Sequence, residues 1–166
     1  PIQGFTQGIQ PIISYNFGAK NFDRVRKTIK ITIIVAFSFT LTECLLITQF
    51  PEVFARIFTS EEELTALVVR VMPIFMSGIW LFGVQMGCQT TFMGLGQAKI
   101  SLFIALLRKV ILLIPLAVIL PAITGDVLSI YFAEPISDIT SATTSGILLL
   151  IFHKRILSEE AWEKIQ

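Results

Sequence analysis

The sequence predicts an all-α membrane protein: a bundle of about four full transmembrane helices preceded by a partial N-terminal helix. Apolar residues make up 54% of the chain, charged residues only 15%, and the mean hydropathy is +0.76, far from the balance of a soluble domain. The charges gather in a few short segments, separated by apolar stretches of about 20 residues, the length that crosses ~30 Å of hydrocarbon. Helices are expected because a spanning segment must satisfy its own backbone hydrogen bonds.

Four apolar stretches are long enough to span the bilayer: Ile31–Phe50, Val71–Met93, Ile100–Ile123 and Leu128–Phe152. Residues 1–14 have a helical pattern but are too short to span. We interpret them as one end of a longer helix, and the chain as a fragment of a longer protein. Pro73, Pro115 and Pro121 are expected to kink or end their helices.

The charged connections between the spans alternate in sign. Residues 20–30 carry five Lys or Arg and one Asp, whereas residues 51–70 carry four Glu and two Arg. The next two connections contain Lys99 and then Asp126, and the tail is basic again. The positive-inside rule therefore predicts a multi-pass protein of the cell membrane, with loop 15–30, loop 94–99 and the tail 153–166 in the cytoplasm.

The segment EVFARIF at residues 52–58 has its own amphipathic pattern. Val53, Phe54, Ile57 and Phe58 gather on one side, which predicts a short helix lying at the outer membrane interface. A solvated turn is the alternative.

Small and amide side chains recur at helical spacing in two segments. Gly4 with Gly8 and Gly83 with Gly87 form small-xxx-small pairs, which let another helix approach closely. The same segments carry the glutamines Gln7, Gln10, Gln85 and Gln89. One interpretation is that these amides bond across a packed helix interface. The other is that they line a water-filled substrate path.

Four ionisable side chains fall inside the predicted spans: Glu43, Arg108, Glu134 and Asp138. Such groups are costly in hydrocarbon and commonly mark ion or substrate paths. At 1.5 Å per residue, Arg108 and Asp138 lie at similar depth on adjacent antiparallel helices. We therefore predict that Arg108 pairs with Asp138 or Glu134, so that one acid balances the arginine and the other responds to a cation or proton. A static ion pair that only joins two helices is the alternative.

Other classes of function find no support in the sequence. There is no Ser/His/Asp set and only one histidine, so we expect neither an enzyme, nor a metal site, nor a cofactor. Net charge is +1 and no basic stripe with interleaved aromatic residues occurs, so nucleic acid is not an expected partner.

Four motifs resemble the multidrug and toxic compound extrusion (MATE) family, in the same order as in one lobe of its members. They are GFTQGIQPIISYNFGAKNFDRVRK, TTFMGLGQAK, LLRKVILLIPLAVILP and AEPISDITSATTS. The resemblance implies a twelve-helix antiporter with two six-helix lobes, in which residues 1–166 are part of the C-terminal lobe, roughly helices eight to twelve. It implies export of organic, often cationic, drugs or toxins in exchange for protons or sodium ions, with the absent N-terminal lobe as a partner. The acidic site of the family's first helix lies outside this chain, so neither the coupling ion nor the substrate is carried over.

Two alternatives remain open at the level of the sequence. A flippase for lipid-linked oligosaccharides, from the same superfamily, would need cations to meet a pyrophosphate, and Arg108 and Lys109 are candidates. A non-transporting scaffold subunit of the membrane would have no use for acids inside its helices, and Glu43, Glu134 and Asp138 argue against it.

Overall fold

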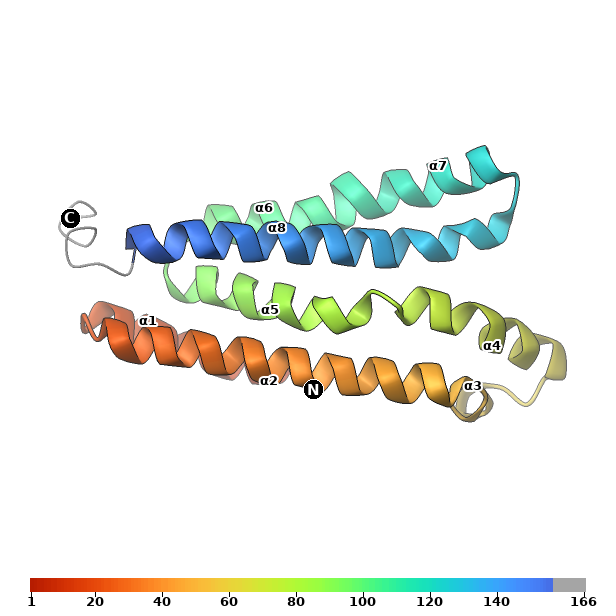
Figure 1. The fold of residues 1–166 in the computed structure, drawn as a ribbon, viewed down its shortest axis with the longest axis horizontal. Helices are drawn as coiled ribbons and strands as arrows, with labels where there is room; N and C mark the ends of the chain where they lie inside the picture. Colours follow the sequence, from red (N-terminus) through yellow and green to blue (C-terminus); the bar gives the residue numbers. More distant parts are fainter. Residues whose placement is uncertain (157–166) are drawn as a thin grey trace.

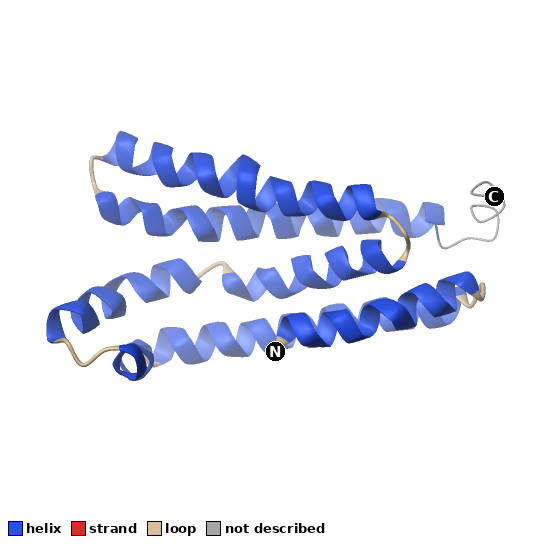
Figure 2. Ribbon diagram, turned by 180° about the vertical axis from the view of Figure 1, so that it is seen from behind, coloured by secondary structure: helices blue, strands red, loops and turns tan. Residues whose placement is uncertain are grey.

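The chain folds as a bundle of long helices that run parallel and antiparallel to one another (Figure 1). The structure is a computed structural model that describes residues 1–156, and within that range it contains helices and short connections but no strand (Figure 2). The elements are α1 (Ile2–Gly18), α2 (Phe22–Gln49), α3 (Pro51–Phe58), α4 (Glu62–Met76), α5 (Ile79–Gly94), α6 (Ala98–Leu106), the π-helical segment η1 (Leu107–Leu113), α7 (Ile114–Thr124), the 3₁₀ segment η2 (Val127–Phe132) and α8 (Ala133–Ile156).

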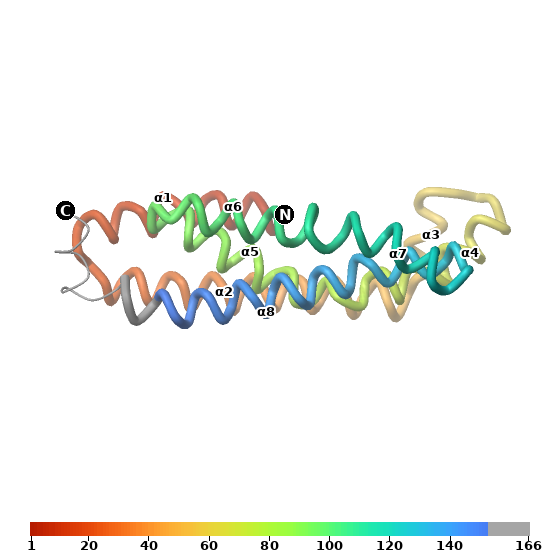
Figure 3. The backbone as a smooth tube through the Cα atoms, turned by 90° about the horizontal axis from the view of Figure 1, so that it is seen from above, coloured from red at the N-terminus to blue at the C-terminus, as the bar shows by residue number. Residues whose placement is uncertain are grey.

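Helix α5 is the centre of the bundle. It lies between α2 and α8 (Figure 1), and it also contacts α1 and α6. Seen from above, α1 and α6 lie on one side of the molecule and α2 and α8 on the other (Figure 3). The core accordingly forms around α5, where Cys88 and Phe92 are buried among Ile13, Val25 and Ile104.

Three continuous helical runs have the length and apolarity of a membrane span: Phe22–Gln49, Ala98–Thr124 and Val127–Phe152. A fourth span is formed if α4 and α5, which meet at an angle of 45°, are taken as one broken helix. These four runs correspond to the four predicted spans. Apolar side chains such as Val118 and Leu150 remain exposed on the outer faces, as expected where lipid replaces water.

The loop predicted at residues 15–30 is wrong in its extent. Helix α1 continues to Gly18 and α2 begins at Phe22, so that only residues 19–21 connect them. Lys20 makes this tight turn possible by adopting a positive φ of 59°. The other four basic side chains that suggested a loop stand instead on the first turns of α2, beyond its apolar part. The connection at residues 94–99 is likewise short, because α5 ends at Gly94 and α6 begins at Ala98.

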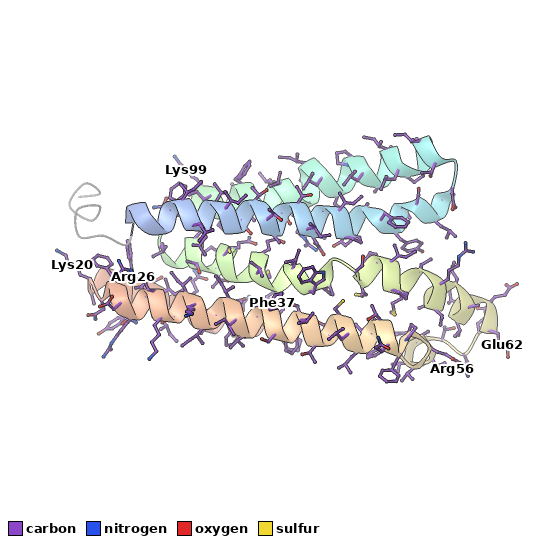
Figure 4. The ribbon with its side chains drawn as sticks, in the orientation of Figure 1. Lys20, Arg26, Phe37, Arg56, Glu62 and Lys99 are labelled. Atoms are coloured by element: carbon purple, nitrogen blue, oxygen red, sulfur yellow. The ribbon has the colours of Figure 1, made fainter. Side chains whose placement is uncertain are left out.

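The charges still separate along the bundle. Lys20, Arg26 and Lys99 lie at the end where α1 meets α2 and α5 meets α6, whereas Arg56 and Glu62 lie at the opposite end (Figure 4). We call these the basic end and the acidic end. The predicted tail, residues 153–166, lies outside the described residues from residue 157 onward.

The three prolines that were expected to kink or end their helices have different local consequences. Helix α4 contains Pro73 and ends three residues later, at the bend before α5. Pro115 follows the π-helical segment η1, as expected where a residue without an N–H interrupts the α-helical hydrogen bonds. Pro121 lies inside α7 without ending it, since α7 continues to Thr124 and stops at Gly125, which has a φ of 69°.

Helix α3 lies across the bundle at its acidic end, and in Figure 1 it is seen end-on while α2 and α4 run across the view. It is the short helix that the sequence predicted at residues 52–58. The side chain of Ala55 faces the bundle and is buried, whereas Ile57 and Phe58 are 68% and 84% exposed. Glu52 and Arg56 pair on one flank at 2.8 Å. This orientation and amphipathic pattern are typical of a helix that lies in the membrane interface.

We expect the apolar edge of α3 to insert among lipids. An environment-sensitive fluorophore is attached to a cysteine at position 58 (Phe58→Cys) of the protein in vesicles. It should emit at shorter wavelength than the same fluorophore does in water, and brominated lipids should quench it. The control is Glu61→Cys, an exposed position in the connection after α3. Equal emission and equal quenching at the two positions would contradict the interfacial placement.

Candidate functional site: an arginine–carboxylate cluster beside a polar cleft

Arg108 forms ion pairs with both acids of α8. Its Nε donates a hydrogen bond to Asp138 Oδ1 at 2.5 Å, and its Nη2 donates to Glu134 Oε1 at 2.7 Å. Lys109 Nζ approaches the same Glu134 oxygen at 3.4 Å. The prediction that Arg108 would reach Asp138 or Glu134 is therefore confirmed for both acids. We call these four residues the arginine–carboxylate cluster.

The members of the cluster differ in their access to solvent. The side chain of Asp138 is 2% exposed, that of Arg108 13%, that of Glu134 17% and that of Lys109 54%. Asp138 is therefore fully desolvated and depends on the arginine, because an unpaired buried carboxylate is very unfavourable. Glu134 lies nearer the surface of the bundle and has two cationic neighbours, so it is the acid that is easier to reach from outside.

Local backbone irregularities place the cluster. Arg108 belongs to the π-helical segment η1, and its carbonyl oxygen accepts a hydrogen bond from the Ser137 hydroxyl at 2.6 Å. This bond fixes η1 to α8 between the two acids, Glu134 and Asp138. The guanidinium also lies over the Phe82 ring of α5, 4.4 Å from its centroid, a cation–π distance. The Arg108 side chain, which extends from η1, thus contacts both α5 and α8.

The bend between α4 and α5 meets α8 at the same level. A Cβ at Gly78 would lie 2.6 Å from Pro135 Cα and 3.2 Å from Asp138 Cβ, so only glycine permits this approach. The cluster therefore occupies the level at which the α4–α5 helix is bent and the α6–α7 helix is π-helical. Irregular backbone at membrane depth is typical of functional sites rather than of plain packing.

A separate cleft of about 280 Å³ lies between α1 and α5. Its lining is uncharged and combines amides, hydroxyls and thioethers: Gln3, Thr6, Gln7, Gln10, Met86, Gln89, Thr90 and Met93. Three of the four predicted glutamines, Gln7, Gln10 and Gln89, are therefore brought together at one site. We call it the glutamine cleft.

The fourth glutamine, Gln85, does not belong to the cleft. It is 2% exposed, and its Oε1 accepts a hydrogen bond from the Ser141 hydroxyl of α8 at 3.2 Å. Gln85 thus fits the first interpretation of the glutamines, an amide that bonds across a packed helix interface, whereas the other three line an open space.

Glu43 is not part of the arginine–carboxylate cluster. It lies on α2, in an apolar groove of about 570 Å³ whose lining includes Phe39, Leu46 and Phe54. Glu43 is thus apart from the three other intramembrane charges, because α5 separates α2 from η1 and α8.

The two glycine pairs have different surroundings. At Gly83 a Cβ would overlap the Ala36 carbonyl of α2, and at Gly87 it would lie 3.2 Å from Ile33, so the predicted close packing is confirmed there. At Gly4 and Gly8 a Cβ would meet nothing within 4 Å. No helix of the described chain packs against them, because both face outward from α1.

Other residues at these contacts were not predicted from the sequence. Phe82 holds Arg108, Ser137 holds the backbone of η1, and Gly78 and Gly94 permit close helix contacts. At Gly94 the neighbour is Ile13 of α1, and the Ser14 hydroxyl donates to the Gly94 carbonyl at 2.9 Å. Phe82 could have been found from its spacing of seven residues from Gln89, which places both on one face of a helix. The other three carry no sequence signal of this kind.

A helical membrane bundle with a desolvated ion cluster at one site and an uncharged polar cleft at another is the architecture of a membrane transporter. A family model described as MatE matches residues 1–119. The chain therefore belongs to this family, the multidrug and toxic compound extrusion transporters.

Comparison with individual relatives agrees with this assignment. The multidrug and toxin extrusion protein 1 of Mus musculus is 26% identical over 117 residues, which are 70% of this chain and 21% of the mouse protein. The corresponding protein of Rattus norvegicus is 25% identical over 115 residues. The chain spans about a fifth of the length of these curated relatives.

Solved structures place the fold in the same family. The MATE multidrug transporter DinF-BH, determined as a complex with a bound compound, has a TM-score of 0.85 at 35% identity, over 95% of this chain and 34% of that chain. The Vibrio cholerae transporter VcmN in its bent form has a TM-score of 0.79 at 19% identity, over 94% of this chain and 34% of that chain. At that identity the second likeness concerns the fold alone.

Proposed function

We propose that this chain is part of the C-terminal lobe of a secondary active antiporter that exports organic, often cationic, compounds in exchange for protons or sodium ions. The observation that carries the proposal is the pairing of an arginine–carboxylate cluster with a nearby uncharged cleft. An antiporter needs one group that changes its charge or its bound ion, and one surface that binds the exported compound.

The cluster is suited to the first task. Arg108 carries one positive charge and lies between two carboxylates, so one acid balances the arginine and the other is left to bind a proton or sodium ion. Lys109 is largely exposed and can move away from Glu134 without leaving a buried charge behind. Glu134 is thus the acid that we assign to the exchangeable ion, and Asp138 the one that we assign to Arg108.

The glutamine cleft is suited to the second task. Amides and hydroxyls offer hydrogen bonds of either direction, and Met86 and Met93 adapt to apolar ligands of different shape. Such a lining suits organic compounds of varied structure better than it suits one particular charged compound. It also argues against a flippase, because Arg108 is already paired with two carboxylates and is not free to meet a pyrophosphate.

The rest of the transporter follows from the same proposal. The basic end of the bundle faces the cytoplasm by the positive-inside rule. The absent N-terminal lobe completes the central cavity, and export proceeds by rocking of one lobe against the other.

The experiment that tests this function is export from vesicles that contain the full-length protein. With an imposed proton or sodium gradient, the wild-type protein should export an organic cation. Glu134→Gln should remove the dependence of export on pH or sodium, because an amide takes up no proton in this pH range and lacks the negative charge that would attract sodium. The control is Glu62→Gln, an exposed residue at the acidic end. Wild-type pH and sodium dependence in Glu134→Gln would make the cluster a static ion pair, and an absence of gradient-driven export by the wild-type protein would contradict the function itself.

A further inference from the structure

A further cleft, apart from the two sites already described, opens toward the acidic end of the bundle. It has a volume of about 280 Å³ and lies between α4 and the connection that leads from α7 through η2 into α8 (Figure 1). One wall carries a cation, the opposite wall carries an anion, and both walls carry apolar side chains. The lining includes Arg70, Val71 and Ile74 on α4, and Asp126, Ser129 and Phe132 on the opposite wall. We call it the Arg70–Asp126 cleft.

The two charges of this cleft do not pair with each other. In the part of the chain that the structure describes, the side chain of Arg70 forms neither an ion pair nor a hydrogen bond. Asp126 Oδ1 accepts a hydrogen bond from the Leu128 N–H at 2.9 Å, which leaves the second carboxylate oxygen available. Both side chains are exposed. The cleft therefore presents an open fork of N–H donors on one side and an open acceptor on the other.

The walls that carry the charges are themselves well fixed. The Ser129 hydroxyl donates to the Asp126 carbonyl at 2.7 Å, and the Thr124 and Ser129 hydroxyl oxygens lie 2.9 Å apart. On the other wall, Val71 is only 7% exposed and holds its turn of α4 against the bundle. The separation between the two charges is thus set by packed segments rather than by a long loop.

The cleft lies at the depth of lipid headgroups. Asp138 is near the middle of the membrane-length run Val127–Phe152, and Gly78 lies against Pro135 and Asp138 at the same level. Arg70 precedes Gly78 by eight residues, which is about 12 Å along a helix. Since half of a hydrocarbon layer is about 15 Å thick, the Arg70 guanidinium can reach its polar boundary.

Polarity changes along the cleft in the direction of the membrane. Ile74 lies one helical turn deeper than Arg70, and Phe132, which is 47% exposed, lies deeper than Asp126. The charged end of the cleft is therefore at the headgroups, and its apolar end is at the acyl chains. This combination is the one that a bound phospholipid requires.

We propose that the Arg70–Asp126 cleft binds a phospholipid whose headgroup joins a phosphate to a primary ammonium, as in phosphatidylethanolamine. The phosphate pairs with the Arg70 guanidinium, whose planar fork matches phosphate oxygens, and the ammonium donates to Asp126. An acyl chain then follows Ile74 and Phe132. This inference does not depend on the proposed transport function, because it concerns another part of the molecule.

The pair of opposite charges selects among headgroups. A choline headgroup also carries a phosphate and a cation, but its trimethylammonium has no N–H to donate to Asp126. A glycerol headgroup carries no cation and leaves the carboxylate close to the phosphate without a partner. The expected preference is therefore for ethanolamine over both choline and glycerol.

The test is native mass spectrometry of the purified full-length protein, titrated with phosphatidylethanolamine or phosphatidylcholine of identical acyl chains. Wild type should bind the ethanolamine lipid more tightly. Asp126→Asn keeps the oxygen that accepts the Leu128 N–H but removes the charge, so binding of the ethanolamine lipid should weaken roughly two- to fivefold, the range of a partly exposed ion pair. Binding of the choline lipid should be unchanged. Arg70→Gln should weaken both lipids by a similar factor.

A matched control comes from the same end of the bundle. Arg56 is also exposed but already pairs with Glu52, so Arg56→Gln should bind both lipids as wild type does. Equal affinity of the wild-type protein for the two lipids would overturn the proposal, and so would a preference that survives in Asp126→Asn. Equal losses in Arg56→Gln and Arg70→Gln would show a general effect of surface charge and would overturn it as well.

A competition experiment separates a lipid from a soluble compound with the same headgroup. Glycerophosphoethanolamine carries the phosphate and the ammonium but has no acyl chain to lie along Ile74 and Phe132. It should therefore fail to displace phosphatidylethanolamine at an equal concentration. Displacement at equal concentration would assign the cleft to a soluble phosphate ester and overturn the lipid site.

Discussion

Replacing Arg108 with methionine is expected to destabilise the protein by about 3–5 kcal/mol, the loss that follows when one partner of a buried ion pair is removed. The reason is Asp138, whose side chain is 2% exposed and would be left with its charge inside the bundle. The measurement is the apparent melting temperature of the purified full-length protein in detergent. The double variant Arg108→Met/Asp138→Asn should recover a large part of the loss, because the buried charge is then absent.

A matched control is available on the surface. Arg56 also pairs with a carboxylate, Glu52, at 2.8 Å, but both side chains are more than half exposed. Arg56→Met should therefore change stability by at most about 1 kcal/mol. Similar losses in Arg56→Met and Arg108→Met would show that burial of the cluster has no energetic consequence and would contradict this prediction.

The double variant Gly83→Leu/Gly87→Leu is expected to prevent correct packing of α5 on α2. A side chain at Gly83 would overlap the Ala36 carbonyl and lie 2.5 Å from Thr40 Oγ1. It would also displace the hydrogen bond that Thr40 Oγ1 donates to the Trp80 carbonyl at 2.9 Å. Overpacking of a core commonly costs about 1–3 kcal/mol, and the loss here should exceed that range because backbone atoms, rather than flexible side chains, obstruct the space.

This prediction is measured as the yield of monodisperse protein after size-exclusion chromatography, with insertion into the membrane measured separately. Insertion should be unchanged, because leucine is at least as apolar as glycine. The control is Gly4→Leu/Gly8→Leu, which has the same spacing but meets nothing within 4 Å in the structure. An equal yield from both double variants would contradict the prediction.

The fold could be predicted from the sequence because each membrane span is recognisable from its own residues. A stretch such as Ile100–Ile123 is apolar over the full width of a bilayer, and in that medium a helix is the conformation that satisfies its backbone. The predicted loop at residues 15–30 was wrong for a related reason. Hydropathy records only where the apolar side chains of a helix begin. Helix α2 begins earlier, directly after the backbone turn at Lys20, and its first turns carry the charged residues.

Part of the site was predictable on the same grounds. Arg108, Glu134 and Asp138 are conspicuous because charges are rare at membrane depth, and their equal depth on neighbouring antiparallel spans was enough to predict the ion pair. Glu43 satisfies the same criterion but lies apart from the cluster, in a groove on α2. Counting residues along a helix determines the depth of a side chain. It does not determine which neighbouring helix that side chain faces.

What the sequence by itself determined is the class of protein, the number of spans and the similar depth of Arg108 and Asp138 along neighbouring helices. Only the tertiary structure decided which helix faces meet. It placed Phe82 beneath Arg108, separated Gln85 from the other glutamines, and left Gly4 without a neighbour where Gly83 contacts backbone. The physical reason is that depth follows from the fixed rise of a helix, whereas rotation and bending arise from contacts between segments far apart in the sequence. At Gly78, for example, a bend of 45° exists where glycine lets α8 approach the backbone.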